Sequence, residues 1–297
     1  MKKTVFFIAI AFAVLTASSC LRLDGMLYNP GQKITEYKFD DYVGAELEKL
    51  DSSYTIAPSK RNLFTLESGG YKIYACYVGD IARIATDTVI LYAHGNKYNM
   101  DLYWNRVKLL ANMGGYKHHY GILTFDYRGY GLSEGEATEA GMYEDADACM
   151  KWLKSKGLTN DRLVMYGFSL GSACATELAS APRSMRPDKL ILEAPFSNSD
   201  AIANDGAGGF AVPASFFADT KIDNAAKIRN VQQPFLWLHG KKDDFLQIET
   251  HGEVVWKNYK GIKGTAKRID DAGHSTVPIT MSYPSYMQTI ADFIAGR

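Results

Sequence analysis

The feature that most constrains the fold is a regular alternation between short apolar runs and segments with helical periodicity. The apolar runs are continuous, as in strands that are buried on both faces of a sheet. Parallel strands need helical crossovers, so the alternation predicts an α/β fold with a mostly parallel, doubly wound sheet. The expected strands cover residues 88–95, 121–127, 162–168, 189–194 and 234–240, and residues 266–274 are expected to form a short strand and a loop. The expected helices cover 104–113, 142–157, 170–179, 248–260 and 281–296.

An antiparallel hairpin is expected at the N-terminal edge of this sheet. The segments NLFTLES and YKIYACYV flank the pair Gly69-Gly70, which is a typical hairpin signal. No composition shift, repeat or linker divides the chain. We therefore expect one domain over residues 60–297, preceded by an extension over residues 20–59.

The N-terminus has the layout of an export signal. Lys2 and Lys3 precede an apolar run from Val5 to Leu15, which is too short to span a bilayer comfortably. The end of this segment resembles a bacterial lipoprotein signal, in which small residues precede a lipidated cysteine, here Cys20. Residues 1–19 are thus expected to be a signal peptide, and the protein an exported lipoprotein of the bacterial cell envelope that meets the membrane only through its lipid anchor. Ala17 stands where the common form has Leu, so ordinary cleavage and an uncleaved anchor remain alternatives.

Charge and cysteine content argue against several other classes of protein. The chain has 33 basic and 33 acidic residues, which gives no electrostatic support for binding nucleic acid. Beyond Cys20, three scattered cysteines (Cys76, Cys149 and Cys174) form no disulfide framework and are expected to be buried thiols. The chain has no metal-ligand spacing, phosphate loop or dinucleotide fingerprint, so no metal and no cofactor are expected.

Two stretches fit the Gly-x-Ser-x-Gly pattern of a nucleophile elbow, namely GFSLG (167–171) and GLSEG (131–135). Ser169 directly follows an expected strand, and an expected helix begins immediately after it. Gly167 and Gly171 supply the room that a strained turn needs. Ser133 lies in a loop with no helix after it. We therefore predict Ser169 as the nucleophile, the alternative being a tight structural turn.

A serine nucleophile needs a histidine base and an acid that orients the base. His274 lies in a loop after the last expected strand, downstream of Ser169 with room for an acid between them. Asp243 and Asp244 both follow the strand over residues 234–240, and the chain order alone does not choose between them.

At this point the chain resembles the α/β-hydrolase superfamily of serine hydrolases. The matching motifs lie in the family order across roughly residues 60–297. They are HGN (94–96), DYRGYGLSEG (126–135), GFSLG (167–171), HGKKD (239–243) and DAGH (271–274). Together these motifs are far more specific than the elbow pattern alone.

The resemblance implies roles for particular residues. It implies Ser169 as nucleophile, His274 as base and Asp243, rather than Asp244, as the acid. It also implies an oxyanion hole from the backbone N–H of Leu170 and a second N–H, from Asn96 in preference to Lys97. The stretch DYRGYG resembles a structural turn in the family. This implies that Asp126 and Arg128 brace loops and that Ser133 is not the nucleophile but a bystander.

The resemblance also implies a short cap over residues 197–233. Four cap residues are candidates to line a pocket or simply to pack the cap, namely Phe210, Val212, Phe216 and Phe217. The expected activity is hydrolysis of a carboxylic ester or thioester, on a small-molecule acyl substrate, through an acyl-enzyme intermediate. A small amidase or aminopeptidase, and a catalytically silent binding module on the same fold, remain alternatives.

Overall fold

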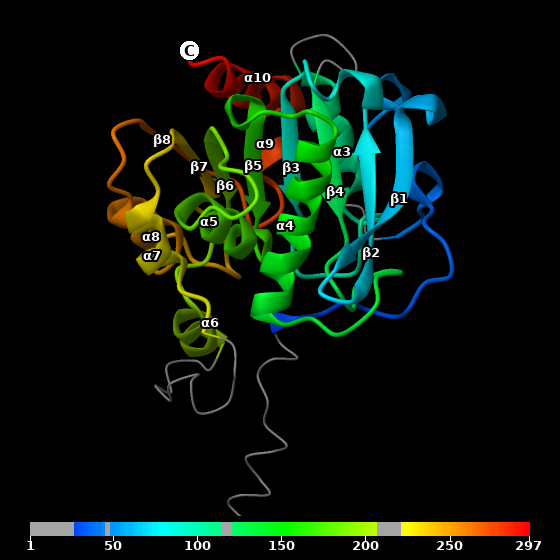
Figure 1. Cartoon of the computed structure of the whole chain (residues 1–297). Coiled ribbons are helices and arrows are strands. Elements are labelled where there is room, and N and C mark those ends of the chain that lie inside the picture. The colour runs from blue at the N-terminus through cyan, green and yellow to red at the C-terminus, as the bar shows by residue number, and fades with distance from the viewer. Residues whose placement is uncertain (1–26, 45–47, 114–119, 207–220) are drawn as a thin grey trace, which may run out of the picture.

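One eight-stranded sheet runs through the centre of the molecule (Figure 1). The computed structural model describes residues 27–44, 48–113, 120–206 and 221–297. The strand order is β1-β2-β4-β3-β5-β6-β7-β8. The strands are β1 (Arg61–Ser68), β2 (Tyr71–Val78), β3 (Val89–Ala93), β4 (Gly121–Phe125), β5 (Leu163–Phe168), β6 (Lys189–Glu193), β7 (Phe235–Gly240) and β8 (Gly264–Ile269).

The sheet is parallel from β4 to β8 and antiparallel at the β1 edge. β1 and β2 form the expected hairpin, with Gly69 and Gly70 both at positive φ in its turn. β2 then pairs antiparallel with β4, while β4, β3, β5, β6, β7 and β8 are parallel neighbours. The predicted fold class is therefore confirmed, and the carboxyl ends of the parallel strands share one edge of the sheet.

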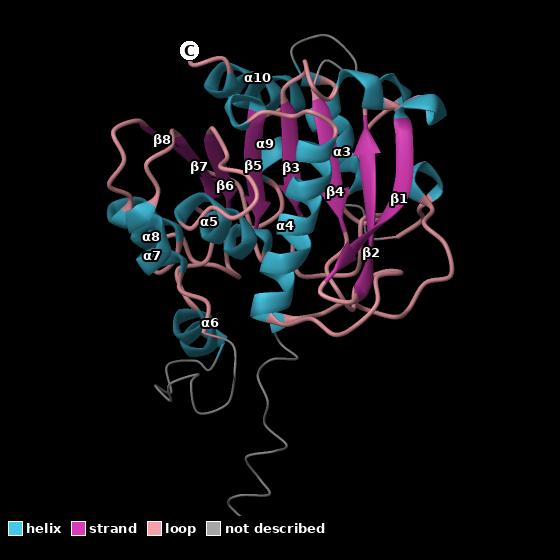
Figure 2. Cartoon of the chain, in the orientation of Figure 1, coloured by secondary structure: helices cyan, strands magenta, loops and turns pink. Residues whose placement is uncertain are grey.

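Helices cover both faces of the sheet (Figure 2). Side chains of α4, α5 and α8 join the buried cluster on one face, and those of α3 and α10 join the cluster on the other. The helices are α3 (Trp104–Ala111), α4 (Glu139–Ser155), α5 (Gly171–Ser180), α6 (Ser199–Gly206), α7 (Asn224–Lys227), α8 (Gly252–Asn258), α9 (Val277–Thr280) and α10 (Tyr283–Ile294). Short 3-10 turns are η1 (Phe39–Asp41), η2 (Ser52–Tyr54), η3 (Pro58–Lys60), η4 (Ile81–Arg83), η6 (Asn160–Arg162) and η8 (Ile228–Asn230).

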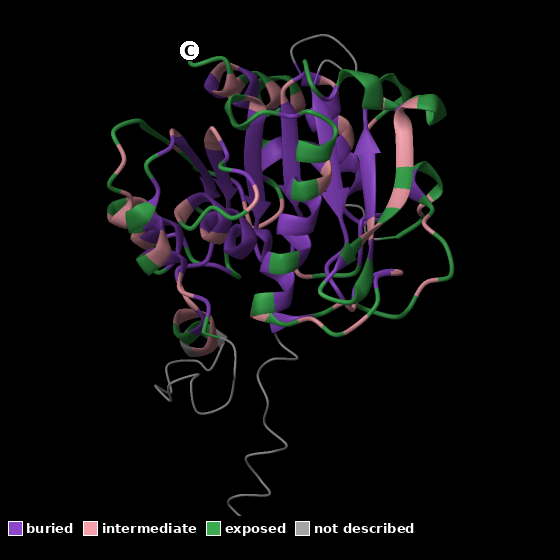
Figure 3. Ribbon diagram, viewed as in Figure 1, coloured by how far each residue is buried: buried purple, intermediate pink, exposed green. Residues whose placement is uncertain are grey.

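The central strands are mostly apolar, and both of their faces are buried. In β3, Val89 and Leu91 point into one cluster, and Ile90 and Tyr92 point into the other. The edge strands β1 and β8 are partly exposed, and their sequences mix polar with apolar residues (Figure 3). The continuous apolar runs in the sequence thus mark the centre of the sheet.

The segment before the hairpin packs against the α3 face of the sheet. Phe39 is buried and lies 4.7 Å from the ring of Trp104, centroid to centroid. The carboxylate of Asp101 accepts hydrogen bonds from the backbone N–H groups of Lys38 and Phe39, at 3.0 and 2.7 Å to Oδ1. Ile56 is also buried in this face.

Two helices near the C-terminus differ from the sequence expectation. The helix expected over residues 248–260 begins only at Gly252, and a short helix, α9, was not expected. Cys20, the pair His118-His119 and the four apolar cap residues Phe210, Val212, Phe216 and Phe217 lie outside the described residues. Within the described ranges, no helix has the length and apolar character needed to cross a membrane.

Candidate active site

Ser169 occupies a sharp turn between β5 and α5. Its φ is +51°, in the left-handed region that non-glycine residues rarely adopt. A Cβ on Gly167 would lie 2.5 Å from the carbonyl oxygen of Gly171, and a Cβ on Gly171 would lie 2.0 Å from that of Ala93. Only glycine fits at these two positions, so the pattern around Ser169 is dictated by close backbone contact. This is the geometry of a nucleophile elbow.

Three side chains from three separate loops form one chain of hydrogen bonds. The Oγ of Ser169, after β5, lies 2.9 Å from Nε2 of His274, after β8. Nδ1 of His274 lies 2.8 Å from Oδ2 of Asp243, which follows β7. With Nδ1–H donating to the carboxylate, Nε2 is left to accept the serine proton. The sequence-predicted nucleophile, base and acid are therefore brought together at the carboxyl edge of the sheet.

The carboxylate of Asp243 is buried but well supplied with donors. Its Oδ1 accepts from the backbone N–H groups of Phe245 and Leu246, at 3.0 and 2.8 Å. Burial alone would raise its pKa, but hydrogen bonds from His239, His274 and the Leu246 amide outweigh burial and hold the pKa well below its usual range. The neighbouring Asp244 is exposed. Of the two candidates, Asp243 is thus the one that lies against His274.

His239 is a second histidine on Asp243, and sequence reasoning assigned it no role. It is fully buried, and its Nε2 lies 3.1 Å from Oδ2 of Asp243 and 2.9 Å from the carbonyl oxygen of Leu246. The indole N–H of Trp237 donates to its Nδ1 at 3.4 Å, so the proton of His239 resides on Nε2. Trp237 and His239 are two residues apart on one strand and thus share a face, which is the signal that could have linked them.

The start of α8 lies close to the same histidine. A Cβ on Gly252 would lie 2.2 Å from Nδ1 of His239. Just before it, His251 is buried and accepts from the backbone N–H of Ser197 at 3.1 Å, while its Nε2 lies 2.9 Å from Oδ2 of Asp205 on α6. His251 thus joins the start of α8 to the cap region, and its backbone (φ −119°, ψ −81°) is not helical.

The two residues whose amides are candidates for the oxyanion hole line a cavity together with Ser169. Leu170 sits at the start of α5, where backbone N–H groups are not used within the helix. Asn96 follows β3, and its side-chain oxygen accepts from the Asn29 amide at 2.6 Å and from Tyr130 Oη at 2.9 Å, which fixes its loop. The amide of Lys97 donates to Tyr103 Oη at 3.1 Å. Lys97 is therefore the weaker of the two candidates for the second amide.

A buried charge cluster lies behind the elbow. The guanidinium of Arg106 is fully buried and donates to Oε1 of Glu48 and Oε1 of Glu193, each at 2.6 Å. Tyr166 and Tyr286 donate to the other oxygen of Glu193. The carbonyl of Glu193 accepts from the amide of Ser169 at 3.0 Å. The cluster thus connects the N-terminal segment, α3, β6 and α10 to the backbone of the elbow.

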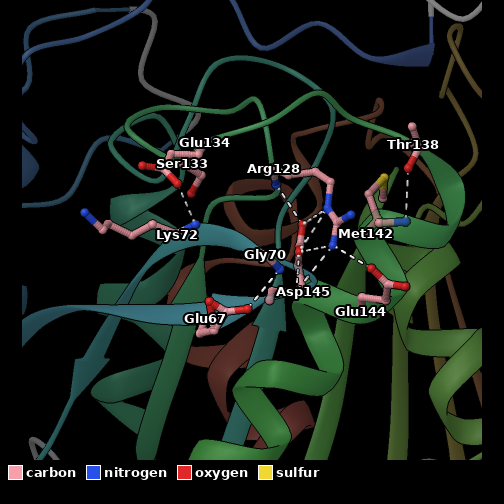
Figure 4. Close-up of polar contacts among 12 residues, drawn as sticks. Glu67, Gly70, Lys72, Arg128, Ser133, Glu134, Thr138, Met142, Glu144 and Asp145 are labelled. Atoms are coloured by element: carbon pink, nitrogen blue, oxygen red, sulfur yellow. Dashed lines mark hydrogen bonds and ion pairs between the residues drawn. The ribbon is translucent and has the colours of Figure 1, made fainter.

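The second Gly-x-Ser-x-Gly stretch has a different surrounding (Figure 4). Ser133 is fully buried, its hydroxyl donates to the carbonyl of Asp126 at 2.8 Å, and it accepts from the Tyr74 amide at 2.9 Å. Nearby, Arg128 pairs with Asp145 at 2.8 Å and with Glu144 at 2.9 Å. These contacts tie the loop after β4 to β2 and α4, in accord with a bracing loop.

The three described cysteines and His94 are buried. Cys76, Cys149 and Cys174 are buried free thiols, and burial raises the pKa of each. His94 is buried, with Nε2 at 3.0 Å from Oδ1 of Asp126. In the part of the chain that the structure describes, no group of three His, Cys, Asp or Glu residues is arranged to hold a metal ion.

Comparison with known proteins shows which family and which relatives the chain resembles. A family model described as alpha/beta hydrolase fold matches residues 88–216. The chain is 33% identical over 180 residues to the lysophosphatidylserine lipase ABHD12 of Danio rerio, covering 54% of this chain and 44% of that protein. It is 27% identical over 208 residues to the uncharacterized protein YfhR of Escherichia coli K12, covering 69% of each. The chain spans about half the length of the ABHD12 relatives that it matches.

Solved structures with low sequence identity share the fold. The esterase Pf2001 of Pyrococcus furiosus superposes with a TM-score of 0.68 at 18% identity, covering 91% of this chain and 98% of that one. At this identity the likeness is one of fold. It extends over nearly the whole of that structure.

Proposed function

The chain belongs to the α/β-hydrolase superfamily, and on that premise we propose that it is a serine hydrolase that cleaves a carboxylic ester or thioester. The observation that carries the proposal is the hydrogen-bonded chain from Ser169 through His274 to Asp243. It is supported by the positive φ of Ser169, since a strained backbone at a sharp strand-to-helix turn is typical of a nucleophile elbow.

The proposed reaction begins with attack of Ser169 Oγ on the acyl carbon. His274 Nε2 takes the hydroxyl proton and then gives it to the leaving group, while Asp243 holds the ring and stabilises its charged form. The amides of Leu170 and Asn96 stabilise the oxyanion of the tetrahedral intermediate. Water, activated by His274, then releases the acid and restores the free hydroxyl of Ser169.

Labelling with a fluorophosphonate probe tests this proposal. The wild-type protein should react at Ser169, and Ser169→Ala should abolish both labelling and ester hydrolysis while leaving the protein folded. Loss of a triad nucleophile lowers kcat on the order of 10⁶-fold. Ser133→Ala is the matched control: it should still label, although the Tyr74 amide loses its acceptor and the protein becomes less stable.

Labelling, together with a comparison of matched ester and amide substrates, separates the two rival functions. A catalytically silent binding module would fail to label even though it is folded. A small amidase or aminopeptidase would label but would prefer an amide to the matching ester. Labelling of Ser133 in place of Ser169 would contradict the assignment of the nucleophile.

We also propose that residues 1–19 are a lipoprotein-type signal peptide and that Cys20 carries the lipid of an envelope lipoprotein. Detergent partitioning of wild type and Cys20→Ser after expression in a bacterial host tests this; equal recovery in the aqueous phase would reject it. Beyond residue 19, the proposed division is an extension over residues 20–59 and a hydrolase domain over residues 60–297 with a cap at about 197–233. Because Phe39 and Glu48 are buried against α3, we expect the two parts to fold together.

A further inference from the structure

The described chain begins beside the candidate site. Leu27 is buried and lines a cavity together with Ser169. The residues after it are joined to the loop that follows β3. The amide of Asn29 donates to Oδ1 of Asn96 at 2.6 Å, and the amide of Tyr98 donates to the carbonyl oxygen of Asn29 at 3.0 Å. The start of the described chain is therefore fixed at the carboxyl edge of the sheet, next to the nucleophile.

The C-terminus lies at the opposite edge of the sheet (Figure 1). A Cβ added to Gly296 would lie 3.9 Å from Nζ of Lys263, and Lys263 directly precedes β8. Ile262, one residue earlier, is fully exposed. Because β8 runs parallel to its neighbours, these residues mark the amino edge of the sheet, away from Ser169.

The spacing between Leu27 and Cys20, the proposed site of lipidation, limits how far the carboxyl edge can lie from a membrane. Seven residues span at most about 25 Å when they are fully extended. A domain of this size is roughly 45–50 Å across. With Cys20 held at a membrane surface, the chain is thus too short for the amino edge to rest on that membrane while the carboxyl edge faces away.

Two aromatic side chains are exposed on the loops at this edge. Phe245, after β7, is 56% exposed and lines a cavity of about 280 Å³ with Ser169 and His274. Tyr98, after β3, is 46% exposed, and the preceding Lys97 lines the same cavity. Aromatic side chains with one apolar and one polar end suit the boundary between a membrane and water. We call Tyr98 and Phe245, with the cavity at Ser169, the docking face.

The charges around the docking face have both signs. Lys97 and Asp244 are both exposed, and Lys242 pairs with Asp271 at 2.7 Å. Attraction to anionic lipid needs a cluster of basic residues, so the docking face shows no preference for such lipids. Apolar contact is the interaction that this edge offers to a bilayer.

We propose that the docking face rests on the lipid bilayer that holds the anchor, so that Ser169 faces the bilayer and reaches amphiphilic esters dissolved in it. The protein then meets the membrane through this face as well as through the lipid on Cys20. The proposal rests on the proposed hydrolase function and on the proposed lipidation, and it adds the direction in which the site faces.

Attaching the protein to vesicles at either edge tests the proposal. In the chain that begins at Cys20, the other three thiols are buried, so a maleimide phospholipid in phosphatidylcholine vesicles should couple at Cys20. Cys20→Ser combined with Arg297→Cys moves the attachment to the opposite edge. Each attached protein is then labelled at Ser169 with two fluorophosphonates, a hexadecyl probe held in the vesicle and a soluble ethyl probe.

We expect the ratio of the hexadecyl to the ethyl labelling rate to be roughly tenfold higher or more with attachment at Cys20, because a short tether helps only where the geometry lets both partners meet. Equal ratios for the two attachments would overturn the proposal. Failure of the soluble probe to label either protein would instead reject the proposed function. Equal aqueous recovery in the partitioning experiment would remove the anchor, and the proposal with it.

Two matched variants of the protein attached at Cys20 test the docking face itself. Tyr98→Asn removes an exposed ring, and Asn tolerates the positive φ of 58° at this position. The labelling ratio should fall by roughly threefold or more, since less apolar surface is buried against the bilayer. Ile262→Asn removes an exposed apolar side chain from the opposite edge and should leave the ratio unchanged. No fall with the Tyr98 variant, or an equal fall with the Ile262 variant, would overturn the assignment of this face.

Discussion

His239 and His274 approach the same carboxylate oxygen of Asp243, at 3.1 and 2.8 Å. One histidine faces the nucleophile, whereas the other is fully buried and held by Trp237. The carboxylate is thus fixed from two sides, and its orientation depends on a residue that touches no substrate.

Asp243→Asn and Asp244→Asn should differ sharply. Without the Asp243 carboxylate, His274 loses control of its tautomer and the charged ring loses its partner, so we expect kcat to fall by roughly 10⁴-fold with little change in KM. Asp244 is exposed, and its replacement should leave kcat within about threefold of wild type. Steady-state kinetics at neutral pH measure both, and the reverse ranking would transfer the role of the acid to Asp244.

His239 should act as a positioning residue for Asp243. His239→Leu removes a donor from Oδ2, so we expect kcat to fall by roughly 10- to 100-fold with KM little changed, because the acid is then less well aligned. The acidic limb of the pH profile of kcat/KM should also move to higher pH, since Asp243 with one donor fewer is a stronger acceptor for the His274 proton.

His239→Gln is the matched variant for this test. Its amide nitrogen can occupy the position of Nε2 and donate to Asp243, so it should restore most of kcat and the wild-type pH profile. If the Gln and Leu variants behave alike, or if the profile does not move, His239 only fills space.

The stability of the protein should depend on Asp243 in acid. The folded pKa of Asp243 lies below the value of about 3.9 expected for the unfolded chain. The unfolded chain therefore takes up the proton first as the pH falls, and the stabilisation, complete above about pH 4, is lost towards the lower folded value. The free energy of unfolding in urea, measured from pH 6 to pH 2.5, should fall more steeply for wild type than for Asp243→Asn. Parallel curves would contradict the lowered pKa.

Arg106→Met should be strongly destabilising. The substitution leaves Glu48 and Glu193 buried without their cation, which typically costs about 3–5 kcal/mol. Lys241→Met is the control, because Lys241 pairs with Asp270 at the surface and its loss should have a much smaller effect. Urea unfolding measures both variants, and equal small losses would mean that the buried cluster does not stabilise the fold.

Much of the fold could be predicted because the apolar runs in the sequence mark the central strands, which are buried on both faces. The runs around β3, β5 and β7 are apolar on both faces, and glycines or helical periods follow them. Prediction failed where a contact distant in sequence decides the outcome. His251, just before α8, has a non-helical backbone and contacts Ser197 and Asp205, and no local pattern reveals these contacts.

The candidate site likewise contains residues that the local sequence predicts and residues that it does not. Ser169 could be identified from its immediate neighbours because the elbow is a local backbone structure. The choice between Asp243 and Asp244 needed the register of the family motif, since adjacent loop residues differ only in direction. The pairing of Arg106 with Glu48 and Glu193 joins residues 58 and 87 positions apart, and nothing in the sequence announces it.

The charge cluster around Arg106 also sets the order of events during synthesis. Its members run from Glu48 near the start of the described chain to Tyr286 near its end, so the cluster cannot be completed until α10 has left the ribosome. Until then Arg106 has to remain hydrated, because an isolated charge is costly to bury. The centre of the molecule therefore closes only once α10 is available, and contacts this distant in sequence favour slow folding.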